Sequence, residues 1–135
     1  MTDLNALLEK VRSASDGSRE LDLEIWNAIS PDAPWRFTEL GSITCDRYGP
    51  NAAGNPVVRL NAFTSSIDDA LLAAESAFPG FEWTRHMDDG TPAQDVVEIA
   101  WRENDTADWI FVEGKAGSTP LAIVAAVIKA KMAQA

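Results

Sequence analysis

The segment Leu121–Ile128 constrains the fold of this chain more than any other part, because its sequence LAIVAAVI contains no polar residue. A helix on the surface of a globular domain has one apolar and one polar face, so a helix through this segment needs apolar neighbours on every side. It must lie at the centre of the monomer or be covered on its far face by a second subunit. We expect this helix over residues 119–133, with Thr119 as N-cap and Pro120 in the first helical position.

Three earlier segments carry apolar residues at the spacing of a helix face. Ser18 can cap the second of them. Ser65, with Asp68 three residues later, matches a capping box at the start of the third. The sequence therefore predicts helices over residues 3–13, 18–30 and 66–78.

Three other segments alternate between two side-chain faces, which is typical of strands. Short turns containing Asp, Asn, Thr or Gly separate them, so the strands are expected to form an antiparallel meander. They are expected over residues 81–87, 93–102 and 108–113. Residues 42–48 and 56–60 are two further candidate strands, joined by a loose loop rich in Gly, Pro and Asn.

The order of these elements predicts the fold class. Helices before, between and after the strands favour an α+β fold, a layered α/β/α sandwich in which helices flank a mostly antiparallel sheet. The length of 135 residues suits a single domain over residues 1–135, because two separate cores would each be marginal in size.

The charge and the cysteine content disfavour several classes of function. The chain has 11 Lys and Arg against 21 Asp and Glu, a net charge of −10, and no basic block. Direct nucleic-acid binding and attachment to a membrane surface are therefore disfavoured, since both depend on clustered cations. The single cysteine, Cys45, excludes an intramolecular disulfide, and the first residues do not resemble a signal peptide, so we expect a cytoplasmic protein.

Several short segments resemble those of a known family. They are LNALLEK at 4–10, RELD at 19–22, FTSSIDDAL at 63–71, FPGFEW at 78–83 and TPLAI at 119–123. Their order resembles the phage ABA-sandwich domain, a group of small phage and prophage proteins with helices on both sides of a sheet. The resemblance implies that fold and a phage or prophage origin, but no catalytic residues. Phe63 and Phe81 depart from the family pattern, where Tyr and Trp are expected, and residues 42–60 do not align with it.

Two residue sets could carry chemistry, and we expect neither to do so. His86 with Asp88 and Asp89 could bind a metal, but the spacing lacks the paired ligands of known metal motifs, and an Asp-Asp-Gly turn explains the acids. Cys45 and His86 could form a nucleophile and base, but no hydrolase signature surrounds Cys45. The sequence thus predicts no metal site, no cofactor and no enzyme activity.

A candidate ligand site lies in the small-residue segment 114–119, which leads into the last helix. Backbone N–H groups at a helix N-terminus can hold an anion, and Lys115 would add charge beside Gly117, Ser118 and Thr119. Plain helix capping is the favoured alternative, since Ser, Thr and Pro are common at helix starts.

Tryptophans give a second candidate surface. Trp83, Trp101 and Trp109 fall on predicted strands, where they could form a stacking platform for a base or sugar, although core packing is the more common use. Trp35 follows Pro34 in the irregular segment and is expected at the surface.

These observations favour an accessory protein that acts by non-catalytic binding. The partner would be a host or phage protein, or a second copy bound through the C-terminal helix. A small-ligand or nucleotide-binding protein is the alternative. The acidic charge also suits a DNA mimic, but solubility explains it equally well.

Overall fold

The described part of the chain contains four helices and five strands. In this computed structural model it comprises residues 3–29, 35–37, 43–45, 62–86 and 95–134. The helices are α1 (Leu4–Ser13), α2 (Arg19–Ile29), α3 (Ile67–Ala77) and α4 (Thr119–Gln134). The strands are β1 (Trp35–Phe37), β2 (Ile43–Cys45), β3 (Glu82–His86), β4 (Asp95–Trp101) and β5 (Ile110–Ala116). The four helices predicted from the sequence are confirmed to within one residue at each end.

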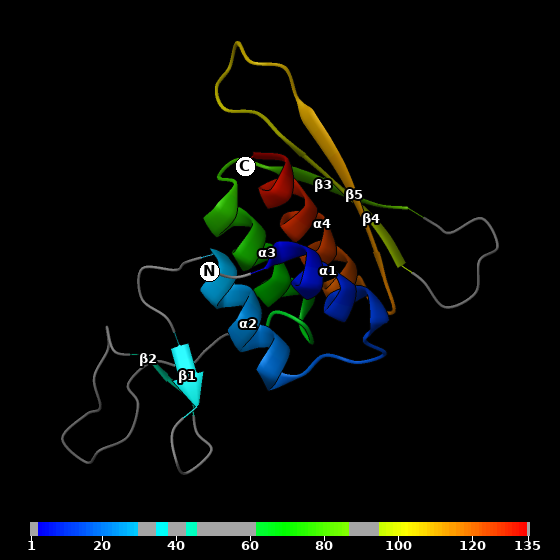
Figure 1. Cartoon of the computed structure of the whole chain (residues 1–135). Helices are drawn as coiled ribbons and strands as arrows, with labels where there is room; N and C mark the ends of the chain where they lie inside the picture. The colour runs from blue at the N-terminus through cyan, green and yellow to red at the C-terminus, as the bar shows by residue number, and fades with distance from the viewer. Residues whose placement is uncertain (1–2, 30–34, 38–42, 46–61, 87–94, 135) are drawn as a thin grey trace.

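The α+β class is confirmed, because an antiparallel sheet packs against helices. Within the described residues the layers run from the sheet to α4 and then to α1 and α3, with α2 beside them (Figure 1). The other face of the sheet carries exposed side chains such as Phe111 and Glu113. A helical layer on that second face, as an α/β/α sandwich would have, is not among the described residues.

The main sheet has the order β3-β4-β5, and both strand pairs are antiparallel. Trp83, Ile99 and Val112 form one row across the three strands. Directly paired residues point to the same face of a sheet, and Ile99 and Val112 belong to the core or pack on it. This row therefore marks the face that lies against α4.

A separate two-stranded sheet is formed by β1 and β2, with Trp35 opposite Cys45. The sequence suggested a loose hairpin of residues 42–48 and 56–60, and the structure shows β2, within the first of these segments, paired with β1. Antiparallel neighbours joined by a short connection are the simplest hairpin, and Trp35–Phe37 is close to β2 in the chain. Residues 56–60 lie outside the described residues.

Helix α4 is the centre of the core. Every residue from Thr119 to Ile128 is buried, and Ile123 and Val127 have no exposed surface. The sheet covers one side of the helix, and α1 and α3 cover the others (Figure 1). The uniform apolarity of this segment is thus explained within one chain. None of the helices in the described ranges combines the length and apolarity that a membrane span requires.

Gly114 sets how closely α4 approaches the sheet. A Cβ atom at this position would lie 2.3 Å from the carbonyl oxygen of Ala122 and 2.4 Å from the backbone nitrogen of Ala126. The sequence pattern predicts that the last strand ends at residue 113 and that Gly114 lies in a loop. In the structure β5 continues to Ala116. Gly114 does not end the strand, because it is the position where the strand approaches α4 closely.

A buried polar cluster joins α2 to the turn before α3. Asp22 has no exposed surface, and its Oδ1 accepts hydrogen bonds from the backbone N–H and the hydroxyl of Thr64, at 2.8 and 2.7 Å. Its Oδ2 accepts from Arg19 Nη1 at 2.7 Å. Ser18 caps α2 as predicted, accepting from the Leu21 N–H, and its own N–H donates to Thr64 Oγ1. These bonds link segments more than 40 residues apart.

The cap of α3 lies one residue later than predicted. Ser66, not Ser65, accepts from the Asp69 N–H at 3.3 Å, and the Asp69 carboxylate accepts from the Ala62 N–H at 2.9 Å. The shift arises because residues 63–65 form a turn that presents Thr64 to Asp22. Both patterns place a Ser three residues before an Asp, so the sequence alone could not separate them.

Candidate functional site

The residues of the predicted anion loop have separate structural positions. Lys115 lies on β5 and is exposed, with its Nζ 3.7 Å from Glu113 Oε1. Gly117 lies against the end of α1, because a Cβ there would be 3.1 Å from the Ala14 carbonyl oxygen. Ser118 Oγ accepts from the Leu121 N–H at 3.4 Å, so the capping alternative is confirmed for Ser118.

Thr119 is not the N-cap that the sequence suggested, because its hydroxyl is used elsewhere. The hydroxyl donates a hydrogen bond to Asp95 Oδ2, at the start of β4. Arg85 Nη2 donates to the other carboxylate oxygen of Asp95 at 3.2 Å. The beginning of α4 thus already has a carboxylate of this chain beside it. The hydrogen bond from Thr119 is the main cause that lowers the pKa of Asp95, and Arg85 lowers it further while burial opposes both.

We expect the Asp95 carboxylate to make stability depend on pH in acid. Its folded pKa lies below the ordinary value of 3.8, so its contribution is present above that value and is lost as the pH falls through the folded pKa. Urea unfolding of the wild type should therefore lose more stability from about pH 5 to about pH 3 than unfolding of Asp95→Asn. Asp105→Asn, a change of the same kind at a fully exposed acid, serves as control. Equal pH dependence in wild type and Asp95→Asn would contradict the assignment.

The tryptophans are distributed rather than gathered into one platform. Trp26 stacks on Phe63 with ring centroids 5.3 Å apart, and Trp101 contacts Phe78 at 4.9 Å. Trp109 precedes β5 and packs under the Arg102 guanidinium at 4.6 Å. Trp35 lies on β1 rather than in irregular chain, and the surface position expected for its side chain lies outside the described residues.

The residues weighed for metal binding or catalysis do not form a described cluster. His86 is exposed at the end of β3, while Asp88 and Asp89 lie outside the described residues. Cys45 is the last residue of β2. In the part of the chain that the structure describes, no group of three or more His, Cys, Asp or Glu side chains is placed to hold a metal ion.

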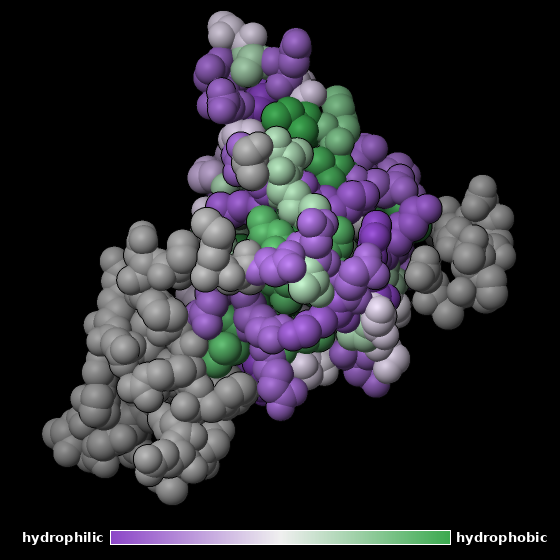
Figure 2. Space-filling view, viewed as in Figure 1, coloured by the Kyte–Doolittle hydropathy of each residue, from purple (hydrophilic) through white to green (hydrophobic). Residues whose placement is uncertain are grey.

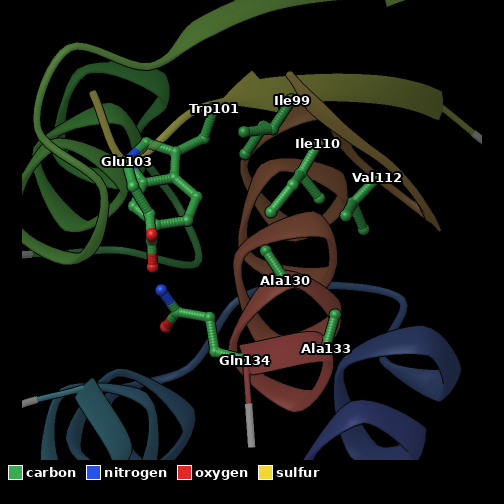
Figure 3. A pocket seen from close by; sticks show the side chains of 8 residues that line it. All are labelled: Ile99, Trp101, Glu103, Ile110, Val112, Ala130, Ala133 and Gln134. Carbon is green, nitrogen blue, oxygen red and sulfur yellow. The ribbon is translucent and has the colours of Figure 1, made fainter. Parts of the chain in front are cut away.

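A pocket lies where the sheet extends past the end of α4 (Figure 3). Its volume is about 490 Å³, within the range of ligand pockets. The sheet contributes two cross-strand pairs, Ile99 with Val112 and Trp101 with Ile110. Among the described residues, the lining is Ile99, Trp101, Glu103, Ile110, Val112, Ala130, Ala133 and Gln134.

The pocket exists because α4 carries small residues opposite large ones. Ala130 and Ala133 are three residues apart and lie on one side of the helix, so they leave space that a larger side chain would fill. Trp101 forms one wall, and its contact with Phe78 holds the indole from the side of α3. The walls that these residues form are therefore apolar, and the Trp101 wall is held by packing.

Two polar side chains stand at the open end of the pocket. Glu103, in the turn after β4, and Gln134, at the end of α4, point toward one another there (Figure 3). Neither side chain has a hydrogen-bond or ion-pair partner among the described residues. Within this part of the chain, their oxygens and the Gln134 amide are thus available to a bound group.

Sequence reasoning missed this pocket. Its residues come from a strand pair, a turn and a helix end, and none belongs to a motif. The usable signal was Ala130 and Ala133, two small residues at helical spacing in the helix expected at the centre of the core. Comparison with known proteins adds no assignment, because no family model, no curated protein and no solved structure matches this chain.

Proposed function

We propose that this chain acts by non-catalytic binding, and that a protein partner inserts an apolar side chain into the pocket between Trp101 and the end of α4. The observation that carries the proposal is this pocket of about 490 Å³, together with the exposed apolar surface around it. Such a combination of a pocket and an apolar flank is typical of protein interaction sites.

The apolar surface extends beyond the pocket itself. Ile110 lines the pocket and is 42% exposed, and Trp83, in the same row as Ile99, is 37% exposed. Figure 2 shows apolar surface next to the hydrophilic tip of the β4–β5 hairpin. A free small molecule would be covered by the pocket alone, whereas a protein would also cover this flank.

The identity of the partner rests on the resemblance to the phage ABA-sandwich domain. In this proposal the chain is a phage or prophage accessory protein in the host cytoplasm, and its partner is a host or phage protein. A second copy of the chain is a further candidate partner. It would bind at the pocket, since Ile123 and Val127 on α4 are already covered within the monomer.

The pocket also supports an alternative function, in which the protein sequesters a small ligand. The observation that favours it is the pairing of apolar walls with two polar groups that have no partner among the described residues, as in many small-molecule sites. A native mass spectrum of the purified protein separates the cases. Doubled mass indicates self-association, a small added mass indicates a retained ligand, and the bare monomer leaves a separate protein partner.

Filling the pocket should abolish binding and leave the fold intact. Ala133 is exposed in the last turn of α4, so Ala133→Phe places a ring in the pocket without disturbing the core. The neutral probe 4-phenyl-1-butanol should shift the NMR signals of the Trp101 indole and the Gln134 amide in wild type. In Ala133→Phe we expect the affinity to fall at least about tenfold, equivalent to about 1.4 kcal/mol.

The matched control is Asn5→Phe, which adds a similar ring on an exposed position of α1. It should bind the probe like wild type. If the probe shifts neither pocket signal in wild type, the pocket is not a binding site and the proposed function fails.

A further inference from the structure

We infer that the group bound in this pocket carries a positive charge next to its apolar part, so that the partner offers an apolar side chain adjacent to Lys or Arg. This inference rests on the proposed function and adds the chemistry of the partner. It follows from the charges at the open end of the pocket and from the direction of α4.

The charged group that lines the pocket is acidic. Glu103 is the single ionisable residue among the described residues of the lining, and it has no cationic partner within the described chain. The turn that holds it also contains Asp105 and Asp108 against one base, Arg102. That arginine is already engaged, over the Trp109 ring at 4.6 Å and 3.7 Å from Asp105.

The end of α4 gives a second, independent preference for a cation. The helix ends at Gln134, which lines the pocket, so its last carbonyl groups lie at the open end. A helix C-terminus carries a partial negative charge and favours cations. Of the two lysines near this end, Lys129 donates to the Glu113 carbonyl oxygen at 2.7 Å, and Lys131 lies in the last turn but does not line the pocket.

Three capped peptides test the inference: acetyl-Gly-Gly-Phe-Lys-Gly-Gly-amide and its Gln and Glu analogues. Binding is followed by the NMR shifts of the Trp101 indole and the Gln134 amide at low salt. Because Glu103 is exposed, the charge effect is moderate. We expect the Lys peptide to bind about two- to fivefold more tightly than the Gln peptide, with the Glu peptide weakest, and the difference to shrink with added salt.

Variants of the protein test whether Glu103 causes the preference for the Lys peptide. Glu103→Gln should reduce the difference between the Lys and Gln peptides, whereas Asp105→Asn, the same change outside the lining, should largely keep it. The amine 4-phenylbutylamine separates a free ligand from a protein segment. If it binds more tightly than the Lys peptide, the source is a small amine and the commitment to a protein partner is wrong.

Failure of the charge inference can be distinguished from failure of the proposed function. If the three peptides bind equally to the wild type, or if the Glu peptide binds best, the charge inference is wrong while the pocket remains a binding site. If neither the peptides nor 4-phenyl-1-butanol shift the pocket signals, the proposed function fails as well.

Discussion

The Gly114→Ala variant is expected to lose at least about 3 kcal/mol of stability, at the upper end of what overpacking a core costs. The added methyl group would lie 2.3 Å from the Ala122 carbonyl oxygen and 2.4 Å from the Ala126 nitrogen. Both atoms belong to the backbone of α4, so no side-chain rotation can relieve the clash. The helix must move away from β5, and its contacts with the sheet are lost. Urea unfolding followed by circular dichroism measures the effect.

Gly80→Ala is the matched control, because it adds the same methyl group where no atom lies within 4 Å. Gly80 has a φ of 81°, so this variant should cost about 1 kcal/mol through backbone strain alone. If Gly114→Ala costs no more than Gly80→Ala, the close approach of α4 to β5 is not present in solution.

The Val127→Glu variant is expected to unfold or aggregate. Val127 has no exposed surface in the single chain, and removing a charge from water without a partner costs several kcal/mol. That loss is comparable to the total stability of many domains of this size. Circular dichroism and sedimentation velocity should show loss of helix together with aggregates or an expanded monomer.

Leu72→Glu makes the same change of charge on α3 at a side chain that is 55% exposed, and it should stay folded. A folded, monomeric Val127→Glu from a wild type that is dimeric would mean that this face of α4 contacts a second subunit. The packing of α4 within the monomer would then be incorrect.

The helices were predictable because their signals are local. Apolar spacing and capping residues placed all four within one residue of their observed ends. The choice between Ser65 and Ser66 as cap depended on Thr64, whose partner Asp22 lies 42 residues away. Nothing in either segment identifies that pairing, so a sequence pattern could place the helix but not its first bonds.

The candidate site was less predictable, because it depends on which elements pack against one another. Gly114 ends a strand by its usual preference, but the crossing of α4 requires a glycine within the strand. Thr119 is a good cap by type, yet Asp95 takes its hydroxyl. The pocket arises from missing volume at Ala130 and Ala133, and alanine is ordinary in any helix.

The central position of α4 also determines when this chain can fold during its synthesis. The buried residues of α1, Leu7, Leu8 and Val11, belong to the core around a helix that begins more than 100 residues later. By contrast, β5 and α4 are neighbours in the chain, so their contacts need little loop closure. The early helices therefore have no core to join until residues 119–134 have been made, and their apolar faces stay exposed to other proteins until then.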